Sequence, residues 1–165
     1  MRESRELDVS QHLSDYSALK KLIEEGGDLK PYLSRDIARR YRADKNDGLL
    51  NAWGIQHLHF RPQGTKYVLF VIIKDADVFV IQSLPHDGPD AWVNPQLLQI
   101  IQDNWPDLAP PRIRGIQPEP LSIKNRVDLR KNNVNFLTAT SDGTSYLGSR
   151  SPHPDALSPI FGIRT

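Results

Sequence analysis

The chain has 165 residues, of which 38% are hydrophobic and 25% charged, with a net charge of +1 and no cysteine. This length and composition suffice for one hydrophobic core, so wholesale disorder is excluded. The lack of cysteine excludes disulfide bonds, thiolate metal sites and a cysteine nucleophile, and the small net charge argues against a global field that attracts nucleic acid.

The N-terminal ten residues alternate charges and contain no apolar segment of the kind that signal peptides carry. The longest apolar run, residues 68–73, is too short to cross a bilayer. We therefore predict a soluble, cytoplasmic protein without a membrane partner.

Two helices are predicted near the N-terminus. Residues 14–25 repeat apolar side chains at helical spacing, and Gly26 and Gly27 provide a stop. Residues 34–41 form the second helix, because Ser34 can cap its first turn.

The middle of the chain changes to the period of a β-strand. Residues 54–60 alternate strictly, residues 67–74 are rich in β-branched side chains, and residues 78–84 follow after a tight connection. These three runs predict an antiparallel meander. Residues 95–104 then carry an apolar stripe at helical spacing, which predicts a helix packed on the sheet.

The C-terminal third is rich in proline and less regular. Residues 106–120 contain five prolines and predict an extended connector. Residues 134–140 and 144–147 flank a turn that contains Gly143, which predicts a β-hairpin.

These elements together predict an α+β fold with N-terminal helices, a central antiparallel meander, a helix on the sheet and a C-terminal hairpin. One domain is expected over residues 1–148. Its parts are a core at residues 14–105, a connector at 106–120 and a C-terminal hairpin module at 121–148, followed by a loop-like tail at 149–165.

Three histidines are the candidate catalytic residues. His57 and His59 are two residues apart in a predicted strand, so both imidazoles point to one side, about 7 Å apart along the backbone. His86 follows the third predicted strand, and the meander topology can bring it beside the other two.

Two chemistries suit such a cluster. In metal-free RNA cleavage, a neutral histidine accepts the 2′-hydroxyl proton, a protonated one donates to the leaving oxygen, and a cation such as Arg61 stabilises the phosphate. In metal hydrolysis, the three histidines hold a divalent ion such as zinc, and Asp75, Asp77 or Asp87 supports them. A structural interpretation stays open, because histidines on a half-buried sheet often only satisfy hydrogen bonds.

The C-terminal module contributes a second set of polar residues. Arg130, Lys131 and Tyr146 could bind a phosphate backbone. Alternatively, Arg130 pairs with Asp128 or Asp142 and the set has no binding role.

The order of elements resembles that of small ribonuclease toxins of the RelE-like kind. The segments His57-Leu58-His59-Phe60-Arg61 and Lys66-Tyr67-Val68-Leu69-Phe70-Val71 are similar to their consecutive central strands and cover under a third of the chain. The resemblance implies metal-free RNA cleavage on a sheet face, and residues 112–165 depart from the compact toxin plan.

The leading hypothesis is a metal-independent endoribonuclease of a toxin or defence system that needs no cofactor and binds RNA and an antitoxin-like protein. Its catalytic residues are His57, His59 and His86, and its substrate-binding residues are Arg61, Arg130, Lys131 and Tyr146. The alternatives are a metal-dependent hydrolase that holds zinc with the same three histidines, or an interaction module without catalysis. The absence of nucleotide-binding glycine loops, a serine nucleophile elbow and a zincin helix disfavours those enzyme classes.

Overall fold

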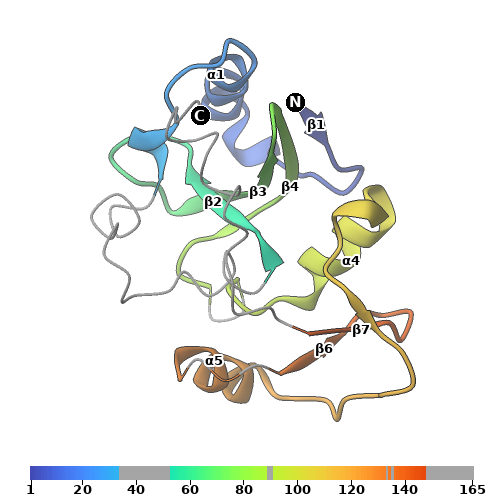
Figure 1. Ribbon diagram of the computed structural model, residues 1–165. Coiled ribbons are helices and arrows are strands. Elements are labelled where there is room, and N and C mark those ends of the chain that lie inside the picture. Colours follow the sequence, from blue (N-terminus) through green and yellow to red (C-terminus); the bar gives the residue numbers. More distant parts are fainter. Residues whose placement is uncertain (34–52, 89–90, 133, 135, 148–165) are drawn as a thin grey trace.

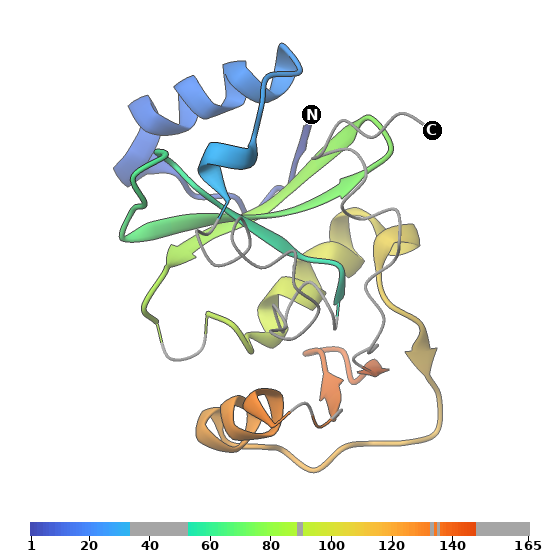
Figure 2. The ribbon, with the colours of Figure 1, turned by 60° about the vertical axis from the view of Figure 1, so that its left-hand side comes forward.

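The computed structural model describes residues 1–33, 53–88, 91–132, 134 and 136–147. It confirms the α+β class: a four-stranded sheet lies between one helix on each face, and a smaller sheet and a helix lie beyond one of them (Figures 1 and 2). The elements of this sandwich are β1 (Arg2–Glu3), α1 (Leu13–Glu24), β2 (Gln56–His59), β3 (Tyr67–Lys74), β4 (Asp77–Pro85) and α4 (Pro95–Asn104).

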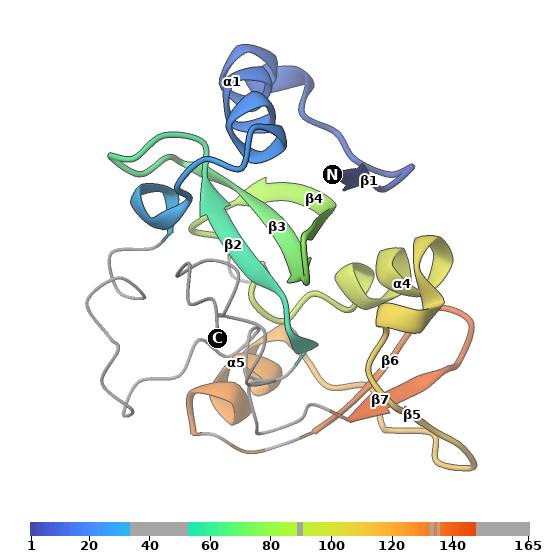
Figure 3. The ribbon, with the colours of Figure 1, turned by 45° about the horizontal axis from the view of Figure 1, so that its top comes forward.

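The strand order of the main sheet is β1-β4-β3-β2, and the β2-β3-β4 part is the predicted antiparallel meander (Figure 3). β1 was not predicted and pairs in parallel with β4. A strand of two residues is too short to show alternation, so its pairing depends on the tertiary structure.

The pairing of β3 and β4 contains a bulge. Val71 pairs with Val80, whereas the preceding Phe70 pairs with Gln82, so β4 holds one extra residue at this point. Bulges bend a strand and change which side chains face each side of the sheet.

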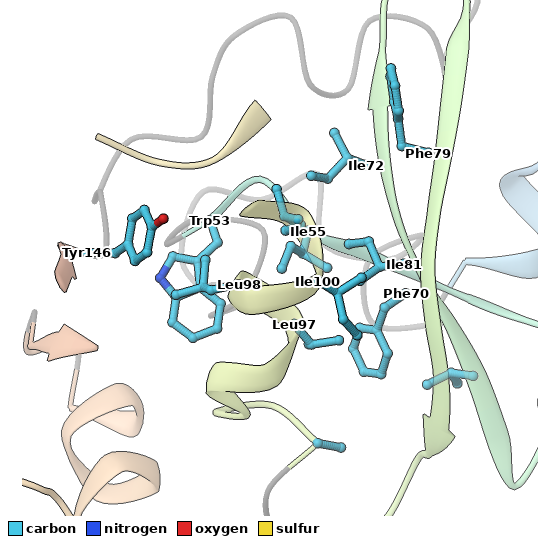
Figure 4. Packing of buried hydrophobic residues seen from close by; sticks show 13 residues of the cluster. Trp53, Ile55, Phe70, Ile72, Phe79, Ile81, Leu97, Leu98, Ile100 and Tyr146 are labelled. Carbon is cyan, nitrogen blue, oxygen red and sulfur yellow. The ribbon is translucent and has the colours of Figure 1, made fainter. Parts of the chain in front are cut away.

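Side-chain alternation gives the main sheet two apolar faces. One face packs on α4 and contains Ile55, Val68, Phe70 and Ile81, all fully buried (Figure 4). The other face packs on α1 and on the segment that follows it. The sheet therefore shields two separate clusters, and a side chain's position in its strand decides to which face it belongs.

The two helices follow their sequence signals. α4 begins after Asn94, whose side chain accepts a hydrogen bond from the backbone N–H of Gln96, and Pro95 occupies its first turn. α1 begins at Leu13, one residue before the predicted start, and Gly26 follows it with a φ of 69°.

The C-terminal part forms a three-stranded sheet of order β5-β7-β6, from β5 (Arg112–Ile113), β6 (Leu137–Ala139) and β7 (Ser145–Leu147). β6 and β7 form the predicted hairpin. The connector at residues 106–120 is more structured than predicted, since it contains a short helix at Pro106–Leu108 and β5. α5 (Ile123–Lys131) was not predicted, because it carries no apolar stripe.

Among the described residues, no helix is long and apolar enough to span a bilayer. The predicted helix at residues 34–41 and the predicted tail at residues 149–165 lie outside the described residues.

An ion pair joins β1 to α1 and predicts a pH-dependent stability. Hydrogen bonds from Lys20 and then from Tyr16, at 2.7 and 2.6 Å, lower the pKa of the Glu3 carboxyl below its usual range. A carboxyl whose pKa is lower in the folded state stabilises the fold above its unfolded pKa, and this contribution is lost as the pH falls through the folded pKa. At pH 7, Glu3→Gln is therefore expected to lower the free energy of unfolding by less than about 1 kcal/mol.

Urea denaturation at a series of pH values measures this effect. The difference between wild type and Glu3→Gln should shrink as the pH falls from about 5 towards 3. Glu119→Gln, at an exposed position, controls for the removal of one charge. A difference for Glu3→Gln that stays constant over this range would contradict the linkage.

Candidate functional site

The structure brings the three candidate histidines together on the α4 face of the sheet. His59 pairs with Val68, and Val68 pairs in turn with Leu84, so the end of β4 lies two strands away from His59. His86 follows β4 directly. Each histidine offers one ring nitrogen, and these three atoms all lie within 4.8 Å of one another.

The rings contact each other in pairs. His59 and His86 are stacked with centroids 5.2 Å apart, and His57 meets His59 and His86 edge-on at 5.8 and 5.9 Å. His57 is 5% exposed, whereas His59 and His86 are partly exposed. The histidine cluster, defined as these three residues, is therefore compact, and two of its members are partly accessible from solution.

A backbone hydrogen bond fixes the tautomer of His59. The N–H of Thr65 donates to Nδ1 of His59 at 3.0 Å. A neutral imidazole has one lone pair, so Nε2 carries the proton and acts as a donor. The Thr65 hydroxyl supports this turn, because it accepts from the N–H of Phe60 at 3.1 Å and donates to the carbonyl of Tyr67 at 2.5 Å.

The neutral His86 ring has the opposite tautomer to that of His59. Its Nδ1 lies 3.0 Å from Oδ1 of Asp87, and an ionised carboxylate can only accept, so Nδ1 carries a proton. In the neutral ring this leaves the lone pair on Nε2. The backbone N–H of His86 donates to the carbonyl of Lys66 at 2.7 Å, which ties the residue to the start of β3.

Trp92 forms a wall of the cluster. Its indole contacts the rings of His57, His86 and Phe70, with centroids 4.7, 5.4 and 5.7 Å apart. Its Nε1 donates to the carbonyl of His86 at 3.2 Å. Trp92 thus packs against two of the three histidines and also holds the backbone that carries one of them.

Arg61 lies away from the histidine face, which corrects the prediction that it shares that face. Its guanidinium binds the carboxylate of Asp15 in α1 through two contacts of 3.0 and 2.9 Å. α1 covers the opposite face of the sheet. Arg61 lies beyond β2, which ends at His59, so the alternation of side chains in the strand does not decide which face it occupies. Its partner Asp15 is 46 positions away in the sequence.

Tyr146 belongs to the core. It is fully buried among the residues that pack on α4, near Trp53 and Leu98 (Figure 4), and its hydroxyl bonds to Oε1 of Gln102. Burial raises the pKa of this phenol. Tyr146 therefore has a packing role in this structure.

Arg130 and Lys131 lie at the C-terminal end of α5, and their side chains are outside the described part of the chain.

Sequence analysis missed two residues near the cluster. Thr65 lies in the turn between β2 and β3, where a threonine gives no distinctive signal. Arg126 of α5 donates from Nη1 to the carbonyl of Val93 at 3.1 Å, next to Trp92. Its only signal was membership of a basic segment at residues 112–131.

The cluster has the residue types of a zinc site, but its hydrogen bonds do not favour one. Three nitrogens within 4.8 Å could converge on a metal ion. A metal would have to compete with the N–H of Thr65 for the one lone pair of His59. The arrangement suits a metal only after this hydrogen bond breaks, whereas it suits proton transfer and hydrogen bonding as it stands.

Comparisons of this chain with protein-family models, with curated proteins and with solved structures find no match.

Proposed function

We propose that this chain is a metal-independent endoribonuclease that acts by histidine general acid–base catalysis. The observation that carries the proposal is the convergence of three imidazoles, two of which, His59 and His86, are held in opposite tautomers by their hydrogen bonds. A reaction that needs one proton acceptor, one proton donor and one fixed hydrogen-bond donor is served by such a set.

His86 is the general base. Its Nδ1–H is held by Asp87, so Nε2 presents the lone pair that would accept the proton of a ribose 2′-hydroxyl. Because Nδ1 remains a donor to Asp87 in both protonation states, His86 can take up a proton and return it without losing this contact.

His57 is the general acid. A protonated imidazole has two N–H donors and no acceptor, and His59 cannot take this form without losing the hydrogen bond from Thr65. His57, whose ring centroid is 5.9 Å from that of His86, is therefore the member assigned to protonate the leaving 5′-oxygen.

His59 contributes a fixed donor. Its Nε2–H can bind a non-bridging phosphoryl oxygen and stabilise the charge that grows there in the transition state. A neutral imidazole that donates a hydrogen bond needs no change of protonation during the reaction.

RNA is the favoured substrate because its own 2′-hydroxyl is the nucleophile. The enzyme then has to move protons and hold the phosphate, which histidines can do without a metal. DNA lacks this hydroxyl and should not be cleaved. A role in a toxin or defence system with an antitoxin-like partner is proposed from the sequence resemblance alone.

The second candidate is a metal-dependent hydrolase, which the 4.8 Å convergence of the three nitrogens favours. The two candidates differ in one requirement. The hydrolase needs the metal for every turnover, while in the ribonuclease a metal bound to the histidines would block proton transfer.

Incubation of the purified protein with an oligoribonucleotide, with and without EDTA, tests the proposal. We expect cleavage that persists in EDTA, leaves 2′,3′-cyclic phosphate ends and is lost in His57→Ala/His59→Ala. His12→Phe is the matched control, since it removes a histidine that packs on Phe60 and Tyr67 at the opposite face and keeps a ring there.

Three outcomes would count against it. Cleavage abolished by EDTA and restored by zinc would support the hydrolase. Cleavage retained in His57→Ala/His59→Ala would show that the activity is not that of the cluster. A folded wild type that leaves RNA intact would favour a non-catalytic interaction module.

A further inference from the structure

α5 is a largely polar helix that lies on the α4 side of the sheet (Figure 2). Lys124 and Asn125 are exposed, whereas Arg126 is partly buried. The helix has no apolar stripe that would explain its docking through hydrophobic contact. Val127 and Leu129 are also partly buried, so Arg126 lies on the inner side of the helix while Lys124 lies on the outer side.

Arg126 is anchored to the chain segment that carries Trp92, a residue in contact with the histidine cluster. Its Nη1 donates to the carbonyl of Val93 at 3.1 Å, across 33 positions of the chain. Val93 follows Trp92 directly, and Trp92 contacts both His57 and His86 through its indole ring. The guanidinium is thus attached to the segment that forms a wall of the cluster.

The guanidinium of Arg126 has an N–H group without a hydrogen-bond partner. Its Nε is buried and makes no hydrogen bond, and no carboxylate of the described residues forms an ion pair with it. Arginine has five N–H donors and no acceptor, and a buried charged donor without a partner is unfavourable. An anionic ligand would satisfy these donors, and the planar fork of arginine matches the oxygens of a phosphate.

We propose that Arg126 binds a phosphate of the nucleic-acid strand held at the histidine cluster. This inference rests on the proposed ribonuclease function and adds a cation that the cluster itself lacks. Arg61, which sequence analysis assigned to this task, is already neutralised by Asp15. Arg126 has no such competitor in the described part of the chain, so its charge is available to a phosphodiester.

Binding of a single-stranded oligonucleotide with 2′-O-methyl groups, which cannot be cleaved through the 2′-oxygen, tests the inference. We expect Arg126→Gln to weaken binding about tenfold. The slope of log K against log salt should fall by about 0.7, as for one lost phosphate contact on a single strand. Arg126→Lys should keep the slope and recover only part of the affinity. Lys124→Gln, at an exposed position of the same helix, should bind almost as wild type does.

Titration with inorganic phosphate gives a readout that does not depend on RNA cleavage. In ¹⁵N-labelled protein, phosphate should shift the Nε–H resonance that is missing from the Arg126→Gln spectrum. Unfolding curves of Arg126→Gln, Arg126→Lys and Lys124→Gln verify that each variant remains folded.

The outcomes separate the two proposals. If wild type binds the oligonucleotide through Arg126 but does not cleave RNA, the ribonuclease function fails and the phosphate site stands. If Arg126→Gln binds with wild-type affinity and salt slope, and phosphate leaves the Nε–H resonance unchanged, the inference about Arg126 is overturned even where RNA is cleaved.

Discussion

His86→Ala is expected to lower the rate of RNA cleavage by about 10²- to 10⁴-fold, which is the usual contribution of a positioned general base. The substitution removes the imidazole whose Nδ1 is held 3.0 Å from Asp87 and whose Nε2 is free to accept a proton. His59 cannot replace it, because its lone pair is engaged by Thr65. Single-turnover cleavage of an oligoribonucleotide in EDTA measures the rate of the chemical step directly.

Asp87→Asn tests how much the orientation of the His86 ring by Asp87 contributes to the rate, because it leaves the imidazole itself in place. Asp87 has a side chain that is 90% exposed, so solvent weakens its influence and we expect a rate loss of about tenfold or less. Asp107→Asn, another exposed carboxylate, should cleave as wild type does. A His86→Ala protein that folds normally and keeps more than about a tenth of the wild-type rate would contradict the assignment of His86 as the base.

Phe70→Ala is expected to lower the free energy of unfolding by about 3–5 kcal/mol. Phe70 is fully buried in β3, packs in the cluster that faces α4 and lies 5.7 Å from Trp92 between ring centroids. The substitution removes this apolar contact and leaves a cavity under the wall of the histidine cluster. Urea denaturation followed by circular dichroism measures the loss.

Two further variants control this prediction. Phe70→Leu keeps most of the volume and should cost clearly less than Phe70→Ala. Lys74→Ala, at the exposed end of the same strand, should stay within about 0.5 kcal/mol of wild type. A loss below about 1 kcal/mol for Phe70→Ala would mean that this face of the sheet is not packed as described.

The sequence was sufficient for elements whose signal is local and repeated. The alternation around His57 and His59 correctly indicated a strand with both imidazoles on one face, and the apolar stripe of α4 correctly indicated its length. α5 escaped prediction because its few apolar side chains do not gather on one side of the helix, and β1 escaped because two residues carry no period.

The side-chain contacts of the candidate site could not be predicted from the sequence. The pairing of Arg61 with Asp15 depends on where α1 docks, and the approach of Arg126 to Val93 depends on where α5 docks. The hydrogen bond from Thr65 to His59 depends on the backbone path of a turn. Each is set by tertiary packing, which a single sequence does not display.

The bulge between β3 and β4 changes which side chains of β4 face α4, shortly before the chain reaches His86. Before the bulge, the odd-numbered Phe79 of β4 faces α4, as does Ile81, the extra residue. After the bulge, the even-numbered Leu84 faces that side. His86 has the parity of Leu84 and therefore lies with His57 and His59. In a regular ladder without the extra residue, the same parity would direct His86 towards α1. The extra residue in β4 thus places Leu84 on the face of the histidine cluster, and His86 follows two residues later on that same face.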